Sequence, residues 1–184
     1  APYLFMIAVG EFAKVDDKWE DIPLAYYVEE EYEADADKIF DNTPEMLAFF
    51  SDYVGVKYPW DKYSQVVVRD YVSGAMENTT GVIFGDFVQK HERELIDNNN
   101  DYIVAHEMFH HWFGDYVTCE SWSNLTMNEG FANYSEYLWE EHHRGKEAAD
   151  YMRSNELRNY LSSAQNQGTH DLIHFEFDDK EILC

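Results

Sequence analysis

The sequence of 184 residues is poor in cysteine and contains no long apolar run. Cys119 and Cys184 are too few for a disulfide scaffold and belong to no paired-cysteine zinc motif, so we expect two free thiols. The longest apolar stretch, residues 3–9, is too short to cross a bilayer and lacks the basic flank of a signal peptide. We therefore predict a buried strand there and no membrane-spanning segment in this chain.

Positive charge is also scarce, because 13 Lys and Arg residues stand against 37 Asp and Glu residues and leave a net charge of −24. Binding to phosphates needs clustered Lys and Arg, so nucleic acid is not an expected partner. We interpret the acidic residues mainly as a solvated surface. A local role for some of them near an amine-binding site is left open.

The composition is nevertheless that of a folded domain, with 45% hydrophobic residues and 14 Tyr, 12 Phe and 5 Trp. A disordered acidic chain should be poor in aromatic residues. The sequence has no internal repeat, low-complexity block or linker, so residues 1–184 are expected to form one domain. Because it starts with Ala1 and stops at Cys184 without an obvious ending, we expect part of a longer protein, with a processed mature start as the alternative. Localisation is not predicted.

Strand patterns dominate the first part of the chain and helix patterns the second. One expected helix has Thr43 as its cap, Pro44 at its first position and Gly55 after its end. The Asn and Asp residues at 98–101 are expected to cap the next helix, and Gly114 to end it. This order predicts an α+β fold, a mixed sheet followed by helices. Strands are expected at residues 3–9, 24–28, 65–69 and 82–87, an extended segment at 115–118, and helices at 44–53, 101–114, about 124–141 and about 146–164.

Two histidines and two glutamates form the most informative pattern. His106 and His110 are four residues apart, so on a helix both imidazoles lie on one face and can bind a single zinc ion. Glu107 lies beside the pair, and Glu129 follows after eighteen intervening residues. Two His and one carboxylate leave a tetrahedral zinc ion with one open position for water, which is typical of a catalytic site. The pattern predicts one zinc ion bound by His106, His110 and Glu129.

The alternative is a solvent-exposed histidine pair on a surface helix. The apolar neighbours Met108, Phe109 and Trp112 indicate a buried helix, where unpaired imidazoles would need partners, and this favours the metal site. His111 is not at ligand spacing and is interpreted as a core or hydrogen-bonded residue. Four further histidines lack a companion motif and are interpreted as structural or surface residues: His142, His143, His170 and His174.

A second motif, Gly74-Ala75-Met76-Glu77-Asn78, is separated from His106 by twenty-seven intervening residues. Together the two motifs resemble the aminopeptidase N family of zinc metallopeptidases, which are gluzincins with a thermolysin-like catalytic domain. The resemblance extends to residues 56–60, 110–114 and 128–132 and is weakest over residues 16–37 and after about 145.

This resemblance implies roles for individual residues. It makes His106, His110 and Glu129 the zinc ligands and Glu107 the general base. The substrate-binding segment would be residues 74–78, in which Glu77 holds the free amino terminus of a peptide. Within that segment Gly74 and Ala75 would contact the substrate backbone, Met76 and Asn78 would support the loop, and Ser73 would lie near the first side-chain pocket.

The chemistry agrees with these roles. Zinc lowers the pKa of its bound water to about 7 and polarises the scissile carbonyl. Glu107 can take the proton of that water and return it to the leaving amine. A substrate ammonium held by Glu77, and also by Glu129, sets the distance from chain end to zinc, so cleavage is expected after the first residue of a peptide with a free amino terminus.

The resemblance also implies parts that lie outside these residues. Family members use a downstream tyrosine to stabilise the oxyanion, and its expected position is beyond Cys184. A β-rich domain would precede this region, and residues 1–10 resemble the end of that domain. The rest of the catalytic domain and a helical domain would follow this region. Losing an oxyanion donor costs about a hundred- to a thousandfold in turnover. We therefore expect these 184 residues alone to bind zinc but to be weak or inactive.

Two other functions are compatible with parts of the pattern. A zinc endopeptidase of thermolysin type shares the ligand spacing, but the segment around Glu77 argues against it. A catalytically dead interaction module should have lost a ligand or Glu107, and none is lost. A relative that acts on an epoxide lipid belongs to the same broad family, but no residue here selects it.

Overall fold

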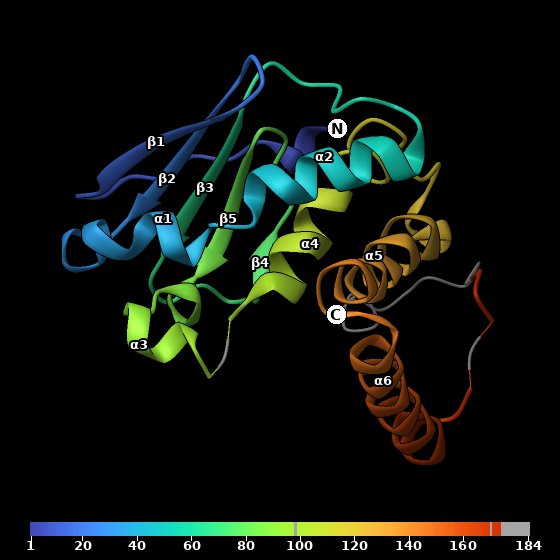
Figure 1. Cartoon of the computed structure of the whole chain (residues 1–184). Helices are drawn as coiled ribbons and strands as arrows, with labels where there is room; N and C mark the ends of the chain where they lie inside the picture. The colour runs from blue at the N-terminus through green and yellow to red at the C-terminus, as the bar shows by residue number, and fades with distance from the viewer. Residues whose placement is uncertain (98, 170, 174–184) are drawn as a thin grey trace.

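The computed structural model describes residues 1–97, 99–169 and 171–173 and shows a five-stranded mixed sheet with helices α1, α2 and α4 over one face (Figure 1). The strand order is β1-β2-β3-β5-β4; β2, β3 and β5 are parallel, and the edge strands β1 and β4 are antiparallel to their neighbours. The strands are β1 (Ala13–Trp19), β2 (Ile22–Val28), β3 (Tyr63–Val68), β4 (Ala75–Met76) and β5 (Gly81–Gly85). This arrangement confirms the predicted α+β class.

Two α-helices, α1 and α2, lie between β2 and β3 along the chain, and the other α-helices follow the last strand. The α-helices are α1 (Ala36–Ile39), α2 (Thr43–Val54), α3 (Glu92–Leu95), α4 (Asp101–Phe109), α5 (Thr126–Arg144) and α6 (Lys146–Gln167). The 3-10 helices are η1 (Pro2–Leu4), η2 (Glu30–Asp35), η3 (Asp86–Val88) and η4 (Trp122–Asn124). None of the helices in the described part of the chain has the length and apolar character that crossing a membrane requires.

The strand expected at residues 3–9 is not formed. Residues 2–4 make a 3-10 turn, and Phe5, Ile7 and Val9 then project into solvent with 76%, 73% and 90% of their surface exposed. The first strand is instead the polar segment β1, which pairs with β2 through a two-residue turn at Glu20 and Asp21. Hydrophobicity alone was misleading because a strand also needs a neighbouring strand, and the short turn brings β1, not residues 3–9, to the edge of β2.

Helix α2 joins the sheet to the rest of the core. Met46, Leu47 and Phe50 are fully buried against the sheet and α4. The predicted cap was wrong, because Thr43 is the first helical residue and its hydroxyl donates to the Gln65 side chain of β3 at 2.8 Å. The predicted end was right, since Gly55 follows the helix in the left-handed conformation with φ of +72°.

Helix α4 begins at Asp101 as predicted but ends at Phe109, five residues before Gly114. The chain then turns, and the Asp115 N–H donates to the carbonyl of His110 at 2.9 Å. The expected caps are absent at the other end too. The Asn100 side chain donates to the Val88 carbonyl, and the Asp101 carboxylate accepts from Asn42, Asn99 and Trp139. The side chains of Asn100 and Asp101 therefore form tertiary hydrogen bonds and do not cap the helix. Of the extended segment expected at 115–118, only an isolated bridge between residues 113 and 117 is present.

Helix α5 packs against α4 and so connects the two halves of the zinc motif. Ala132 and Trp139 are buried on its inner face, and the Ser135 hydroxyl lies 3.2 Å from the Ala105 carbonyl of α4. Helix α6 extends from the end of α5 away from the sheet, and Ala149 is its one buried residue (Figure 1). Both helices match their predicted ranges to within three residues at either end.

Gly55 and Gly145 follow the ends of α2 and α5, and both have a positive φ. A Cβ atom at Gly55 or Gly145 would meet no atom within 4 Å, so substitution changes only the backbone energy. Gly55 has φ 72° and ψ 15°, whereas Gly145 has φ 89° and ψ 168°, a region that is almost restricted to glycine. We expect Gly55→Ala to lower the free energy of unfolding by about 1 kcal/mol and Gly145→Ala by about 1–3 kcal/mol in urea titrations. Equal losses, or no loss in Gly145→Ala, would contradict this reading.

Candidate metal and substrate site

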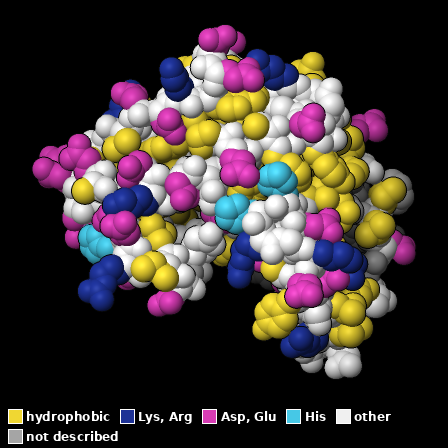
Figure 2. Space-filling view, viewed as in Figure 1, with side chains coloured by type: hydrophobic (Ala, Val, Ile, Leu, Met, Phe, Trp, Pro, Cys, Tyr) yellow, Lys and Arg dark blue, Asp and Glu magenta, His cyan; other side chains and the backbone are white. Residues whose placement is uncertain are grey.

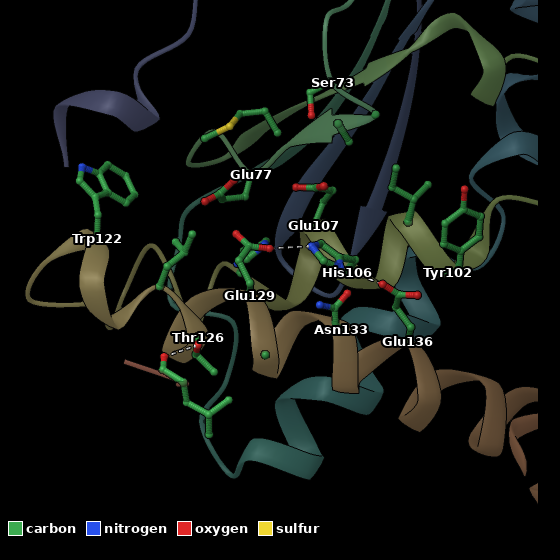
Figure 3. Close-up of a pocket in the computed structure, with 18 of the residues that line it drawn as sticks. Ser73, Glu77, Tyr102, His106, Glu107, Trp122, Thr126, Glu129, Asn133 and Glu136 are labelled. Atoms are coloured by element: carbon green, nitrogen blue, oxygen red, sulfur yellow. Dashed lines mark hydrogen bonds and ion pairs between the residues drawn. The ribbon is translucent and has the colours of Figure 1, made fainter. Parts of the chain in front are cut away.

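The packing of α5 on α4 brings together the three predicted zinc ligands. Figure 3 shows two of them, His106 and Glu129, facing each other. One carboxylate oxygen of Glu129, in the first turn of α5, lies 3.3 Å from Nε2 of His106 and 3.6 Å from Nε2 of His110. His106 is on α4, and His110 is the residue that follows the helix. The helical spacing of the histidines and the packing of α5 on α4 therefore direct three donor atoms to one point.

A second partner orients each imidazole. Nδ1 of His106 lies 2.8 Å from the carboxylate of Glu136, and Nδ1 of His110 lies 3.0 Å from the carbonyl of Phe113. Both partners are acceptors, so they place a proton on Nδ1 and leave Nε2 to face Glu129, as metal-binding histidines require. The sequence analysis missed Glu136. Its position seven residues after Glu129 places it two turns along the same face of α5, and this spacing could have revealed it.

In the absence of metal a proton supplies the positive charge that these groups attract. Burial alone would lower the pKa of His106, but its contacts with Glu129 and Glu136 raise that pKa to about 10. Burial would likewise raise the pKa of Glu129, but both imidazoles outweigh it and hold that pKa at about 2. Two imidazole nitrogens and one carboxylate oxygen are a donor set that fits zinc, so the residues present suit the predicted ion.

Glu107 is buried beside this centre, with 6% of its surface exposed. One oxygen of its carboxylate has no hydrogen-bond partner among the described residues. Burial raises the pKa of Glu107 to about 7, although the two neighbouring imidazoles act against this shift. An unpaired carboxyl with a pKa near neutrality is suited to accept and release a proton.

The segment of residues 74–78 forms the opposite wall. Ala75 and Met76 make the short edge strand β4, and the Gly74 carbonyl accepts from the Gly85 N–H at 3.0 Å. Glu77 is buried, and its carboxylate lies within 4.8 Å of donor atoms of Glu107 and His110. Asn78 points away from the pocket and donates to the Leu4 carbonyl at 3.2 Å, so it supports the loop from behind.

His111 is a fully buried core residue, as predicted. Its Nδ1 lies 3.2 Å from the Glu107 carbonyl, and its Nε2 accepts from the Thr80 N–H at 3.1 Å. Burial lowers the pKa of His111 to about 3, so the ring is neutral and holds the α4 backbone against residues 79–80.

His142 stacks on Phe49 near the surface, and His143 stacks on Trp139. Cys119 is a free thiol, whereas Cys184, His170 and His174 lie outside the described residues.

The three candidate zinc ligands, Glu107 and residues 74–77 line one pocket of about 910 Å³. β4 and the residues before it form one wall, α4 and α5 form the floor, and residues 171–172 return to its edge. Ser73, which was expected near the first side-chain pocket, also belongs to the lining. The further lining residues are Tyr102, Ile103, Trp122, Ser123, Leu125, Thr126, Gly130, Asn133, Glu136, Asp171 and Leu172.

Residues 38–182 match the Peptidase family M1 domain. The chain is 33% identical over 141 residues to a glutamyl aminopeptidase of Bos taurus, a match that covers 74% of this chain and 15% of that protein. It is 40% identical over 96 residues to aminopeptidase M1-A of Oryza sativa subsp. japonica, covering 50% of this chain and 11% of that protein. The chain thus spans about 15% of the length of the first of these relatives.

We expect the purified chain to bind about one zinc ion and Glu129→Ala to lose most of it, because one of three ligands is removed. Glu136→Gln should retain the ligands but weaken zinc affinity about 10- to 100-fold, since it weakens the orientation of His106. Elemental analysis and chelator competition measure both effects. The exposed Glu147 is the control, and Glu147→Ala should bind as the parent does. Full zinc content in Glu129→Ala would exclude this ligand set.

Zinc affinity should also rise with pH. His106 holds a proton up to about pH 10 in the metal-free fold, above its ordinary pKa of 6.5, and zinc must displace that proton. Affinity should therefore increase by up to about tenfold per pH unit for each proton displaced, and chelator competition at pH 6, 7 and 8 measures this increase. The same proton stabilises the metal-free fold fully below pH 6.5, and this contribution is lost as the pH rises towards 10. A zinc affinity that does not change with pH would contradict the pairing of a protonated His106 with Glu129 and Glu136.

Proposed function

Because the chain belongs to peptidase family M1, we propose that it forms the zinc-binding part of an aminopeptidase, which releases amino-terminal residues from peptides. Family membership agrees with the resemblance seen in the two sequence motifs. The observation that carries the proposal is the buried carboxylate of Glu77, which lines the pocket close to Glu107 and His110. A general protease does not need a buried acid that meets the end of a peptide chain.

The proposal assigns His106, His110 and Glu129 as ligands of one zinc ion. Their convergence and the acceptors on both Nδ1 atoms support this assignment. A zinc ion held there would polarise the scissile carbonyl and lower the pKa of a water molecule to about 7. Glu107 would be the general base, because its unpaired oxygen can take a proton from that water and return it to the leaving amine.

Substrate binding would use the edge of β4 and the acid that follows it. β4 pairs with β5 on one side only, so the backbone of Ala75 would offer hydrogen bonds to an extended peptide on the other side. The Gly74 carbonyl already accepts from the Gly85 N–H, so Gly74 would contact the substrate backbone by close approach. Glu77 would bind the substrate ammonium in a charge-assisted contact. This contact sets the register and places the first peptide bond over Glu107. Met76 would form part of the wall.

We further propose that residues 1–184 are one part of a metallopeptidase catalytic domain. The short share of the relatives' length supports this proposal, as does the apolar exposure of residues 5–9, which would adjoin a preceding domain. The oxyanion-stabilising tyrosine would then belong to the part of the polypeptide beyond Cys184. Without such a donor turnover falls about a hundred- to a thousandfold, so the isolated chain would bind zinc with little activity.

The decisive experiment compares free and acetylated peptides in the polypeptide that carries the whole catalytic domain. Glu107→Gln should retain zinc but lose about 10²- to 10⁴-fold in turnover, because the proton acceptor is removed. Glu77→Gln should lower kcat/KM for free peptides about 10- to 100-fold, the value of a charge-assisted hydrogen bond. Glu147→Gln is the matched control and should match the parent.

Three outcomes would reject the proposal. Cleavage of the acetylated peptide as readily as the free one would indicate an endopeptidase. A normal turnover in Glu107→Gln would remove the general base from its role. Zinc binding without hydrolysis of any peptide would indicate an interaction module.

A further inference from the structure

The charge of the pocket is strongly one-sided. Five carboxylates line it, from Glu77, Glu107, Glu129, Glu136 and Asp171. No Lys or Arg among the residues that the structure describes takes part in the lining. Figure 2 shows acidic and basic side chains interspersed on the viewed surface. On the surface of the protein Lys and Arg pair with some of the acids, as Lys146 does with Asp150. In the pocket, donor atoms of Glu77, Glu107 and Glu129 lie within 4.8 Å of His110, so these acids act together on any group bound there.

Zinc and a substrate ammonium would not neutralise all of these acids. Glu129 would bind the zinc ion, Glu77 the ammonium, and Glu136 is already engaged by Nδ1 of His106. Asp171 has none of these roles. It lies beside Leu172, whose carbonyl accepts from the Thr126 hydroxyl at 2.8 Å, so a direct contact with α5 holds this segment at the pocket edge.

Because Leu172 is hydrogen-bonded to Thr126, its neighbour Asp171 belongs to the Thr126 side of the pocket, which is also the side where the first residue of a substrate would lie. Figure 3 shows Glu77, Trp122 and Thr126 on one side of His106, with Tyr102 and Glu136 on the other. The proposed contact between Glu77 and the amino-terminal ammonium of the substrate would keep the first residue, with its side chain, on the same side of the pocket as Glu77. There it meets apolar surface from Trp122, which packs on Tyr3 with ring centroids 4.9 Å apart, and from Leu125 and Leu172.

Apolar walls with a carboxylate at the outer edge suit a long aliphatic stem with a cationic head. We propose that the pocket selects peptides whose first residue is lysine or arginine, with the stem along Trp122 and Leu172 and the head at Asp171. This inference rests on the aminopeptidase function proposed above. It also sets the chain apart from its relatives named for a glutamyl substrate, because an acidic first side chain would find carboxylates and no Lys or Arg among the described residues that line the pocket.

The test compares lysine, norleucine and glutamate p-nitroanilides, because norleucine keeps the stem of lysine and lacks its charge. In the full-length protein kcat/KM should be about two- to fivefold higher for lysine than for norleucine, the range of an exposed ion pair, and lowest for glutamate. The lysine preference should shrink as salt is raised. Asp171→Asn should bring the lysine-to-norleucine ratio close to one, whereas Asp52→Asn, an exposed acid on α2 outside the pocket, should leave it unchanged.

The outcomes separate this inference from the function on which it rests. Cleavage of norleucine anilide without a preference for lysine, or a preference that survives Asp171→Asn, overturns the inference and leaves the aminopeptidase function intact. If no anilide is cleaved, the proposed function fails. In that case calorimetric titration of the zinc-loaded protein with the hydroxamates of lysine and norleucine decides the inference alone. Equal affinities overturn it, and tighter lysine binding that is lost in Asp171→Asn supports it.

Discussion

One contact organises this structure, the approach of a Glu129 oxygen to Nε2 of both His106 and His110. It holds the first turn of α5 against α4, and Glu136 strengthens the same junction two turns later. Helix α4 in turn packs on α2 and the sheet through a continuous apolar core. The packed helices and the sheet therefore fix the positions of the donor atoms, as a metal site with strict donor geometry requires.

The electrostatics of the pocket follow from this packing. Folding brings several carboxylates together out of water, and burial raises the pKa of Glu107 to about 7 while the imidazoles keep Glu129 ionised. Such a group of acids is costly unless positive charge is present. Protons on the histidines supply it in the metal-free chain, and a zinc ion and a substrate ammonium would supply it in a working enzyme. Binding of both cations and stability of the site are thus linked.

The errors of the sequence predictions have a common physical origin. The apolar residues 3–9 looked like a core strand and the polar β1 did not, yet β1 is joined by a two-residue turn to β2 and residues 3–9 have no partner strand. Thr43, Asn100 and Asp101 looked like helix caps, but side chains and carbonyls far along the chain compete for their polar groups. Local propensity predicts what a residue can do, and distant neighbours decide which option is used.

The sequence by itself determined the α+β class, the family, and the candidate residues His106, Glu107, His110, Glu129 and Glu77, because helical spacing and short motifs are local properties of the chain. Only the tertiary structure decided that Glu136 and Phe113 orient the imidazoles, that His111 is neutral within the core, and that Asp171 returns to the pocket edge. These features join residues on different elements or on separate turns of the chain. Their interactions exist only when the packing of α4, α5 and the sheet brings the side chains within contact distance.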